Sequence, residues 1–247
     1  EGPAGNGLRW MMIAPPLEPG KRYPVFFSHY GGPGVRRVSK DWGGALAQAI
    51  VAKGFIYFEL DNRGSSTRGV EFEKAIYRAM GAPEVADQKA GAEYLKTLPF
   101  VDPAKIAIFG WSYGGYMTLK MLEADPGLYA AGISGAPVSR WELYDTHYTE
   151  RYMGTPQADA AAYEKSSTLP DAAKITDPLL LIHGMSDDNV VFTNSTEMIA
   201  ELQQKKVPFE MMLYPGATHS ISGPNLRTHL YETIFDFLTR HGVTPPK

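Results

Sequence analysis

Short apolar runs alternate along the chain with longer segments in which apolar residues recur every three or four positions. The short runs, bounded by glycine, proline or aspartate, are typical of buried strands, and the longer segments are typical of helices. The predicted strands span residues 8–14, 23–29, 55–60, 106–109, 130–134, 178–183 and 209–214. The predicted helices span residues 42–52, 85–98, 116–122, 193–206 and 226–238. Residues 99–103 are predicted to form a connector, and Thr193 or Asn194 to be an N-cap.

The predicted order of elements favours one fold class. Strands alternate with helices, and the central strands are continuously apolar, which is typical of a parallel sheet covered on both faces. We therefore predict an α/β protein with a mostly parallel central sheet and helices on both faces. An aromatic-rich insertion at residues 139–167 breaks the alternation and is predicted to cap or wall the site. In such sheets the ligand site lies beyond the carboxyl ends of the strands.

The candidate nucleophile is Ser112. It is the centre of a G-x-S-x-G motif, Gly110 to Gly114, between a predicted strand and a predicted helix. A strand, a tight turn and a helix are the context of a nucleophile elbow, which pushes the serine hydroxyl clear of the backbone. The alternative interpretation is an ordinary glycine-rich turn, so the remaining loops must supply an acid and a base.

Among six histidines, His219 is the candidate base, because it follows the last predicted strand and a serine hydroxyl needs a nearby base. His183 ends a core strand and is predicted to be structural, and His29 to support the loop at Tyr30. His147 lies in the insertion, where it could line the site.

The candidate acid lies in the loop after residues 178–183. Asp187 or Asp188 could hold the base in the correct tautomer, although both could instead cap the following turn. The order serine, aspartate, histidine is that of α/β-hydrolases and differs from the orders of chymotrypsin and subtilisin.

Composition excludes several other classes. The 247 residues suffice for one large domain or two small ones, and the net charge of −3 gives no sign of nucleic-acid binding. There is no cysteine, and no apolar run approaches the roughly 18 residues that span a bilayer. H-E-x-x-H, Walker and Rossmann motifs are missing, so no metal or other cofactor is expected. The chain starts at Glu1, as expected of a processed chain or an excised fragment.

Four stretches resemble one known family. They are residues 110–116 (GWSYGGY), 136–142 (APVSRWE), 148–154 (YTERYMG), and His183-Gly184 with Asp187 to Val190. The chain resembles the catalytic domain of the prolyl oligopeptidase family of serine peptidases, and most of all its dipeptidyl peptidase IV branch. The likeness runs along essentially the whole chain, and implies one α/β-hydrolase domain over residues 1–247.

The resemblance also implies roles for individual residues. It selects Asp187 as the acid, and it makes the Tyr30 phenol and the Tyr113 N–H the donors to the oxyanion. It places in the wall of the S1 pocket, together with Tyr113, the residues Val138, Trp141, Tyr144, Tyr148 and Val190. Asn189 would then bind a substrate carbonyl, and Arg151 would help to order the wall.

The predicted activity is hydrolysis of peptides after proline or alanine, with release of N-terminal dipeptides in the full-length protein. The alternatives are an acylaminoacyl-peptidase-like enzyme or a carboxylesterase, and, in another class, a non-catalytic binding relative. Family members carry an N-terminal β-propeller that covers the active site, and it is absent from this chain. The expected partners are peptide substrates, that propeller and a second copy in a homodimer, and the resemblance favours a periplasmic or secreted protein.

Overall fold

The computed structural model describes residues 7–246; residues 1–6, which include the start at Glu1, and residue 247 lie outside the described part. The strands are β1 (Arg9–Ile13), β2 (Tyr23–His29), β3 (Ile56–Asp61), β4 (Val101–Trp111), β5 (Ala131–Gly135), β6 (Leu179–Gly184) and β7 (Glu210–Tyr214). The α-helices are α1 (Gly44–Ala52), α2 (Val70–Lys74), α3 (Ala82–Thr97), α4 (Tyr113–Ala124), α5 (Thr146–Met153), α6 (Ala160–Ser166), α7 (Thr193–Gln204) and α8 (Pro224–Arg240). Two short 3₁₀ helices are η1 (Trp141–Leu143) and η2 (Ala172–Lys174).

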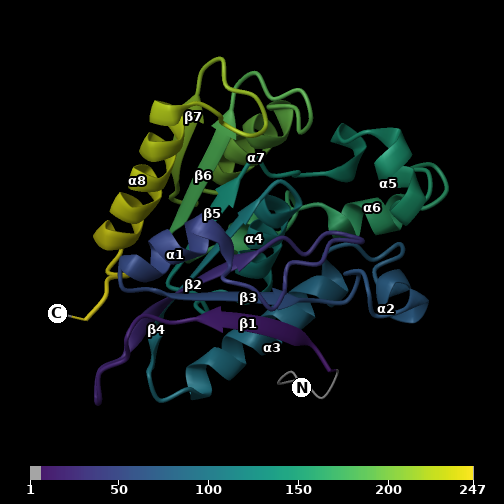
Figure 1. Cartoon of the computed structure of the whole chain (residues 1–247). Helices are drawn as coiled ribbons and strands as arrows, with labels where there is room; N and C mark the ends of the chain where they lie inside the picture. Colours follow the sequence, from purple (N-terminus) through teal and green to yellow (C-terminus); the bar gives the residue numbers. More distant parts are fainter. Residues whose placement is uncertain (1–6, 247) are drawn as a thin grey trace.

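The strands form one seven-stranded sheet in the order β1-β3-β2-β4-β5-β6-β7 (Figure 1). Only the edge strand β1 is antiparallel to its neighbour, and every other pair of strands in this sheet is parallel. Parallel strands end at the same edge of a sheet. The loops that begin at Tyr30, Ser112, Ala136 and after Gly184 therefore share one edge, as predicted.

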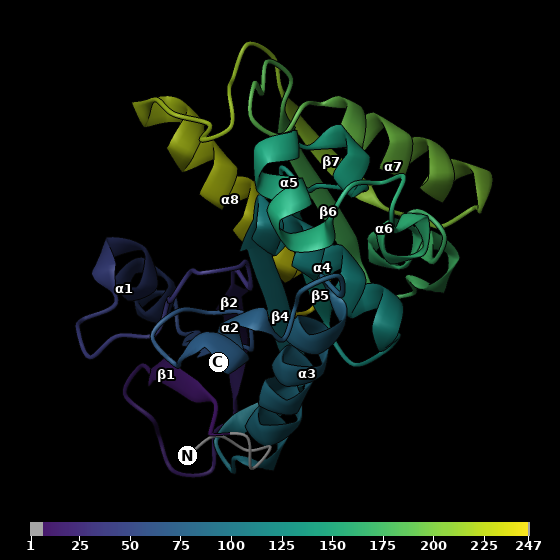
Figure 2. The same ribbon diagram turned by 90° about the vertical axis from the view of Figure 1, so that its right-hand side faces the viewer.

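Helices cover both faces of this sheet (Figure 2). On one face α3, α4 and α7 pack on side chains such as Phe27 and Ile108, and on the other α1 and α8 pack on side chains such as Phe26 and Phe109. This arrangement confirms the predicted α/β class. None of the helices within residues 7–246 is long and apolar enough to cross a membrane.

Several predicted limits differ from the structure, helices α2, α5 and α6 were not predicted, and two of the wrong predictions have a clear physical reason. The predicted connector 99–103 is already strand from Val101, because Val101 pairs with Tyr23 and a shift in register between Tyr23 and Val25 accommodates the polar residues that follow. The N-cap of α7 is Phe192, and neither Thr193 nor Asn194 caps it. Asn194 is fully buried, and its Oδ1 accepts a hydrogen bond of 2.9 Å from the Ser139 N–H instead.

The start of α4 lies directly on the backbone of the sheet. A Cβ atom on Gly110 would collide with the carbonyl oxygen of Gly114, and one on Gly114 would lie 2.6 Å from the carbonyl oxygen of His29. Backbone atoms cannot move aside as a flexible side chain can. Glycine at both ends of the motif is therefore required for α4 to begin where it does.

We expect Gly110→Ala to lower the free energy of unfolding by about 3 kcal/mol or more, because the new methyl group overlaps fixed backbone. Denaturant unfolding measures this change. Gly127→Ala is the control, because Gly127 has open space at its Cβ and a φ of 81°, so alanine there costs only about 1 kcal/mol of backbone strain. Equal losses for the two variants would contradict the collision.

Candidate active site

Ser112 lies between the end of β4 and the first residue of α4, and its side chain is half-buried. Its backbone has φ 61° and ψ −119°, a conformation that a residue with a Cβ rarely adopts. Hydrogen bonds hold it there: the Ser112 N–H donates to the Gly135 carbonyl at 2.8 Å, and its own carbonyl accepts from the Tyr116 N–H at 3.0 Å. The structure therefore has the strained strand-turn-helix that the motif predicts.

The Asp187 carboxylate accepts a hydrogen bond of 2.7 Å from His219 Nδ1, and its side chain is fully buried. Its other oxygen accepts bonds of 2.9 Å from the backbone N–H groups of Asn189 and Val190. Burial alone would raise the pKa of Asp187, but the bonds from His183, His219 and the backbone outweigh burial and lower it. Asp187 thus stays ionised, whereas the alternative acid, Asp188, is exposed.

His183 contributes more than its predicted structural role. Its Nε2 lies 3.1 Å from Asp187 Oδ2 and 2.9 Å from the Val190 carbonyl oxygen. Because both partners are acceptors, Nε2 carries the proton, and Ser195 Oγ donates to Nδ1 at 2.7 Å. Sequence reasoning missed this contact with the acid, although the spacing of four residues between His183 and Asp187 was a signal for it.

A hydrogen bond links His219 to Trp111, the neighbour of Ser112 in the sequence. The indole Nε1 of Trp111, the residue before Ser112, donates a 2.8 Å hydrogen bond to the carbonyl oxygen of His219. Among the described residues, Ser112 Oγ makes no hydrogen bond to His219. Such bonds are often long in an enzyme without substrate and tighten when substrate binds. With Nδ1 donating to Asp187, neutral His219 presents Nε2 as an acceptor.

Of the two predicted oxyanion donors, Tyr113 directly follows Ser112, and Tyr30 lies near the Tyr113 ring. Tyr113 is the first residue of α4, so its N–H has no partner within the helix. The Tyr30 ring lies 5.9 Å from the Tyr113 ring. Burial raises the pKa of the Tyr30 phenol, so at neutral pH it keeps its proton and can donate.

An aromatic wall extends from Ser112 into the insertion, and we define it as Tyr113, Trp141, Tyr144 and Tyr148. Trp141 stacks on Tyr148 at 6.2 Å, and Tyr144 meets both rings edge to face at 6.0 and 5.2 Å. Tyr113 lies 5.3 Å from Trp141 and joins the wall to the nucleophile. The structure thus brings Tyr113, at the start of α4, together with three residues of the insertion that follow much later in the sequence.

The remaining predicted site residues divide into two groups. Asn189 adjoins the wall, because its Oδ1 accepts a 2.9 Å bond from the Tyr144 hydroxyl, and Val138 and Val190 are buried in the same core as Trp141. Arg151 instead contacts His147 at 2.7 Å, and both are exposed.

Glu84, a residue that sequence reasoning missed, supports the wall from below. It is fully buried in α3, accepts a 2.6 Å bond from the Tyr113 hydroxyl and accepts a 2.9 Å bond from the Gly81 N–H. Burial raises its pKa to about 7, although these hydrogen bonds act in the opposite direction. A glutamate soon after Pro83 at a helix start was a signal for such a contact with the backbone.

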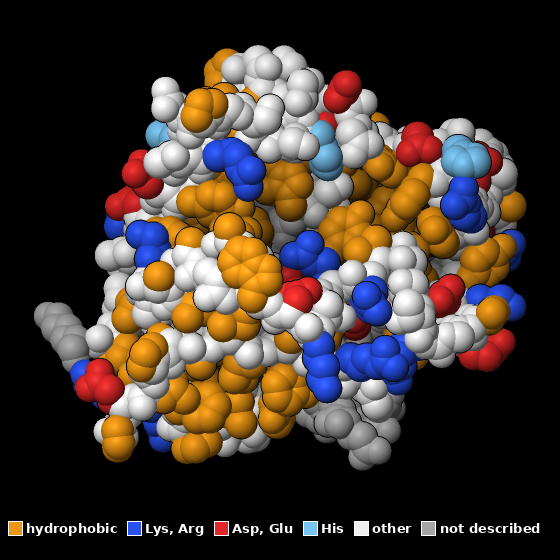
Figure 3. Space-filling view, viewed as in Figure 1, with side chains coloured by type: hydrophobic (Ala, Val, Ile, Leu, Met, Phe, Trp, Pro, Cys, Tyr) orange, Lys and Arg blue, Asp and Glu red, His pale blue; other side chains and the backbone are white. Residues whose placement is uncertain are grey.

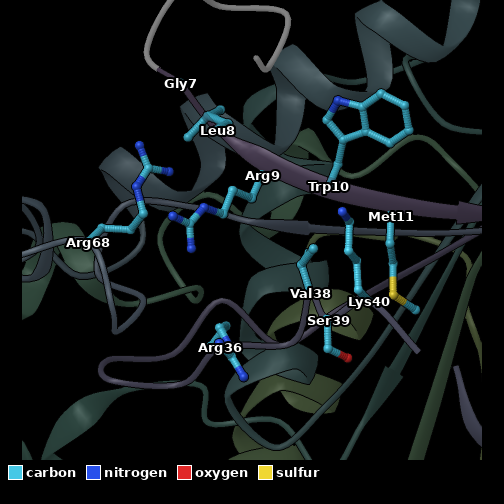
Figure 4. A pocket seen from close by; sticks show the side chains of 10 residues that line it. All are labelled: Gly7, Leu8, Arg9, Trp10, Met11, Arg36, Val38, Ser39, Lys40 and Arg68. Carbon is cyan, nitrogen blue, oxygen red and sulfur yellow. The ribbon is translucent and has the colours of Figure 1, made fainter.

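Other features lie away from this site. Residues 7–246 contain no group of three or more histidine, aspartate or glutamate side chains that could hold a metal ion. A cavity of about 790 Å³ lies beside β1 (Figure 4). Its basic lining residues are Arg9, Arg36, Lys40 and Arg68, and no residue of the candidate site is among its lining.

We expect Glu84→Gln to change how stability depends on pH. The pKa of Glu84 is raised to about 7 from an ordinary 4.5, so between these values the folded chain binds the extra proton, and the free energy of unfolding falls as pH rises. Glutamine stays neutral. The free energy of unfolding of the variant, relative to that of the natural chain, should therefore be roughly 1–3 kcal/mol higher at pH 8 than at pH 5.

Thermal or denaturant unfolding at the two pH values measures this gain. Glu93→Gln, at an exposed position of the same helix, is the matched control and should show no comparable change. The same stability difference at pH 5 and pH 8 for Glu84→Gln would contradict the assignment.

Comparison with known proteins shows the family to which the chain belongs. The model of the prolyl oligopeptidase family matches residues 44–243. The chain is 38% identical over 246 residues to mouse dipeptidyl peptidase 8, covering 96% of this chain and 28% of that protein. It is 41% identical over 228 residues to an Aspergillus fumigatus protein named "Probable dipeptidyl peptidase 4", covering 90% of this chain and 30% of that protein.

The same likeness holds in three dimensions. The crystal structure of Porphyromonas gingivalis dipeptidyl peptidase 4 superposes with a TM-score of 0.89 and 39% identity, covering 94% of this chain and 33% of that one. This confirms the predicted α/β-hydrolase fold. The chain thus spans about a third or less of the length of these relatives. With its matching model, relatives and structure, the chain belongs to the prolyl oligopeptidase family.

Proposed function

We propose that this chain is a serine peptidase domain that hydrolyses peptide bonds after proline or alanine. The observation that carries the proposal is the 2.7 Å bond between His219 and the buried, ionised Asp187, at the sheet edge where Ser112 follows β4. The family membership supports it. Under this proposal Ser112 is the nucleophile, His219 the base and Asp187 the acid.

In the first half of the reaction, Ser112 Oγ attacks the substrate carbonyl carbon as its proton passes to His219 Nε2. The negative charge of Asp187 stabilises the imidazolium that forms. The carbonyl oxygen becomes an oxyanion, which the Tyr30 phenol and the Tyr113 N–H bind. Donors held in place before the reaction cost no reorganisation, and this lowers the barrier.

In the second half, His219 gives its proton to the leaving amine, and the carbon–nitrogen bond breaks to leave an acyl-enzyme. Water then repeats the attack with His219 as its base. The ester bond to Ser112 breaks, and the proton returns to Ser112 Oγ. No cofactor takes part in either half.

The aromatic wall would set the preference for proline. A pyrrolidine ring is rigid, is apolar and offers no N–H, so it suits flat aromatic surfaces. Because the Tyr144 hydroxyl already occupies Asn189 Oδ1, the amide nitrogen of Asn189 is available to a substrate carbonyl. Arg151 would act only indirectly, through His147.

The activity of the whole protein is a further part of the proposal. Release of N-terminal dipeptides would need groups that hold the free amino terminus, and we propose that a β-propeller like that of the family supplies them. The much greater length of the relatives is consistent with such a domain. A homodimer stays a prediction, since α8 packs the apolar residues Leu230, Ile234 and Phe237 against the sheet of its own chain.

We expect the natural chain to hydrolyse Ala-Pro-p-nitroanilide faster than the Ala-Ala anilide, and Ser112→Ala to lose at least about 10³-fold in turnover. The absorbance of released nitroaniline measures both. A short-chain p-nitrophenyl ester is the third substrate. Turnover of that ester without preference for Ala-Pro would favour a carboxylesterase, and turnover that Ser112→Ala retains would refute the assigned nucleophile.

We expect Tyr30→Phe to lower kcat by about 10²–10³ with little change in KM, because the phenol binds the oxyanion only as it forms. Steady-state kinetics on the Ala-Pro anilide separates the two constants. Tyr77→Phe, at an exposed tyrosine, is the control and should behave as the natural chain does. A change in KM with an unchanged kcat would place Tyr30 in substrate binding instead.

A further inference from the structure

A cavity of about 420 Å³ adjoins the candidate active site, and neither the mechanism nor the aromatic wall uses it. Its lining includes Tyr30, Trp111 and Ser220, which are an oxyanion donor and the neighbours in sequence of Ser112 and His219. Seen as in Figure 1, the surface shows hydrophobic side chains in a central hollow with Lys or Arg side chains beside it (Figure 3).

The cavity and the aromatic wall meet at Tyr30, which lines the cavity and lies 5.9 Å from the Tyr113 ring of the wall, but their apolar residues belong to different cores. The apolar lining residues of the cavity, Phe109 and Leu230, belong to the core beneath α1 and α8, whereas Tyr113 and Trp141 belong to the core beneath α3 and α4. Ser112 directly follows β4, the strand that lies between these two cores. A peptide bound across Ser112 with one end on the wall therefore has its other end at this cavity.

The position of His219 identifies which end that is. The general acid must reach the leaving nitrogen, so the leaving peptide lies on the histidine side of the nucleophile. Ser220 to Ser222, directly after His219, line the cavity, and the Trp111 indole that lines it donates to the His219 carbonyl. The cavity is thus on the leaving side of the scissile bond.

The charged side chains that line this cavity are both arginines, Arg37 and Arg227. Arg37 donates to the buried Glu59 at 2.6 and 3.1 Å, which uses two of its five N–H donors. Arg227 is exposed near the start of α8, a helix with no acidic residue in its first turn. A cation is unfavourable at that end of a helix dipole, so helix stability does not explain Arg227.

The positive charges of both arginines act on Tyr231, which also lines the cavity. Burial raises the pKa of Tyr231, and the positive charges of Arg227 and Arg37 act against this rise. The other titratable groups in the lining are His29, whose pKa burial lowers to about 4, and Tyr30, so both are neutral at pH 7. Glu59 neutralises the charge of Arg37, so the charge of Arg227 makes the cavity positive overall.

We propose that this cavity is a subsite for the leaving peptide and that Arg227, assisted by Arg37, makes it prefer an acidic side chain in the first two residues after the scissile bond. This inference rests on the proposed function. Arginine donors bind carboxylates through parallel N–H groups, and the Trp111 and Tyr231 rings offer apolar surface to the aliphatic part of such a side chain. Arg227 is then a specificity-determining residue.

The test compares peptides that differ only in charge, using the protein at its natural length. One pair is Ala-Pro-Ala-Glu-Ala and Ala-Pro-Ala-Gln-Ala, and the other carries Glu or Gln directly after proline. We expect kcat/KM to favour glutamate about fivefold in at least one pair, as for a partly exposed ion pair. About 0.5 M salt should reduce this preference.

Variants then test the residue. Arg227→Gln should bring the ratio of glutamate to glutamine near one, and Arg227→Lys should keep part of it. Arg36→Gln is the matched control, because Arg36 is exposed and lines the separate cavity beside β1 (Figure 4). The control should keep the full ratio.

The outcomes separate this inference from the proposed function. Ala-Pro-p-nitroanilide has no leaving peptide and reports on the function alone. If the natural protein cleaves it but shows no preference for glutamate in either pair, or if Arg227→Gln keeps the preference, the subsite is refuted and the function stands. If the anilide is not cleaved, the proposed function is refuted, and this inference with it.

Discussion

The close approach of α4 to the sheet is the constraint on which the site depends. Gly114 lies on the backbone of His29 at the end of β2, and Gly115 lies against the carbonyl of Gly135 at the end of β5. The helix can begin there only because neither residue has a Cβ. The same approach holds Ser112 in its strained conformation and leaves the Tyr113 N–H beside it, so the proposed nucleophile and one proposed oxyanion donor depend on the same packing.

The buried charge of Asp187 is the second requirement. A carboxylate without partners would be too costly to bury, and Asp187 is ionised because four donors converge on it, from His183, His219 and two backbone N–H groups. The carboxylate in turn fixes the orientation of each group that donates to it. The bond to Asp187 thus orients the His219 ring, and His183 links Asp187 to Ser195 in α7.

The two sides of Ser112 rest on different cores, and this separates two kinds of recognition. The aromatic wall belongs to the core of α3, α4 and α7, where Glu84 holds the Tyr113 hydroxyl. The cavity with Arg37 and Arg227 opens over the core of α1 and α8. One side therefore has packed aromatic rings and the other positive charge, and Tyr30 lies between them, because it lines the cavity and packs near Tyr113.

The sequence by itself determined the α/β class, most strand positions, the elbow, and the choice of Ser112 and His219, because these follow from local patterns: apolar runs, G-x-S-x-G, and the residue after each strand. It left Asp187 and Asp188 equivalent, and only the family resemblance chose between them. Tertiary structure decided what depends on distant backbone and burial. Asp188 is exposed, whereas Asp187 binds His219. Asn194 binds the Ser139 N–H and does not cap its helix. Val101 pairs with Tyr23, which extends β4. Glu84, His183 and Arg227 gain their importance only from contacts across the fold, which no local pattern contains.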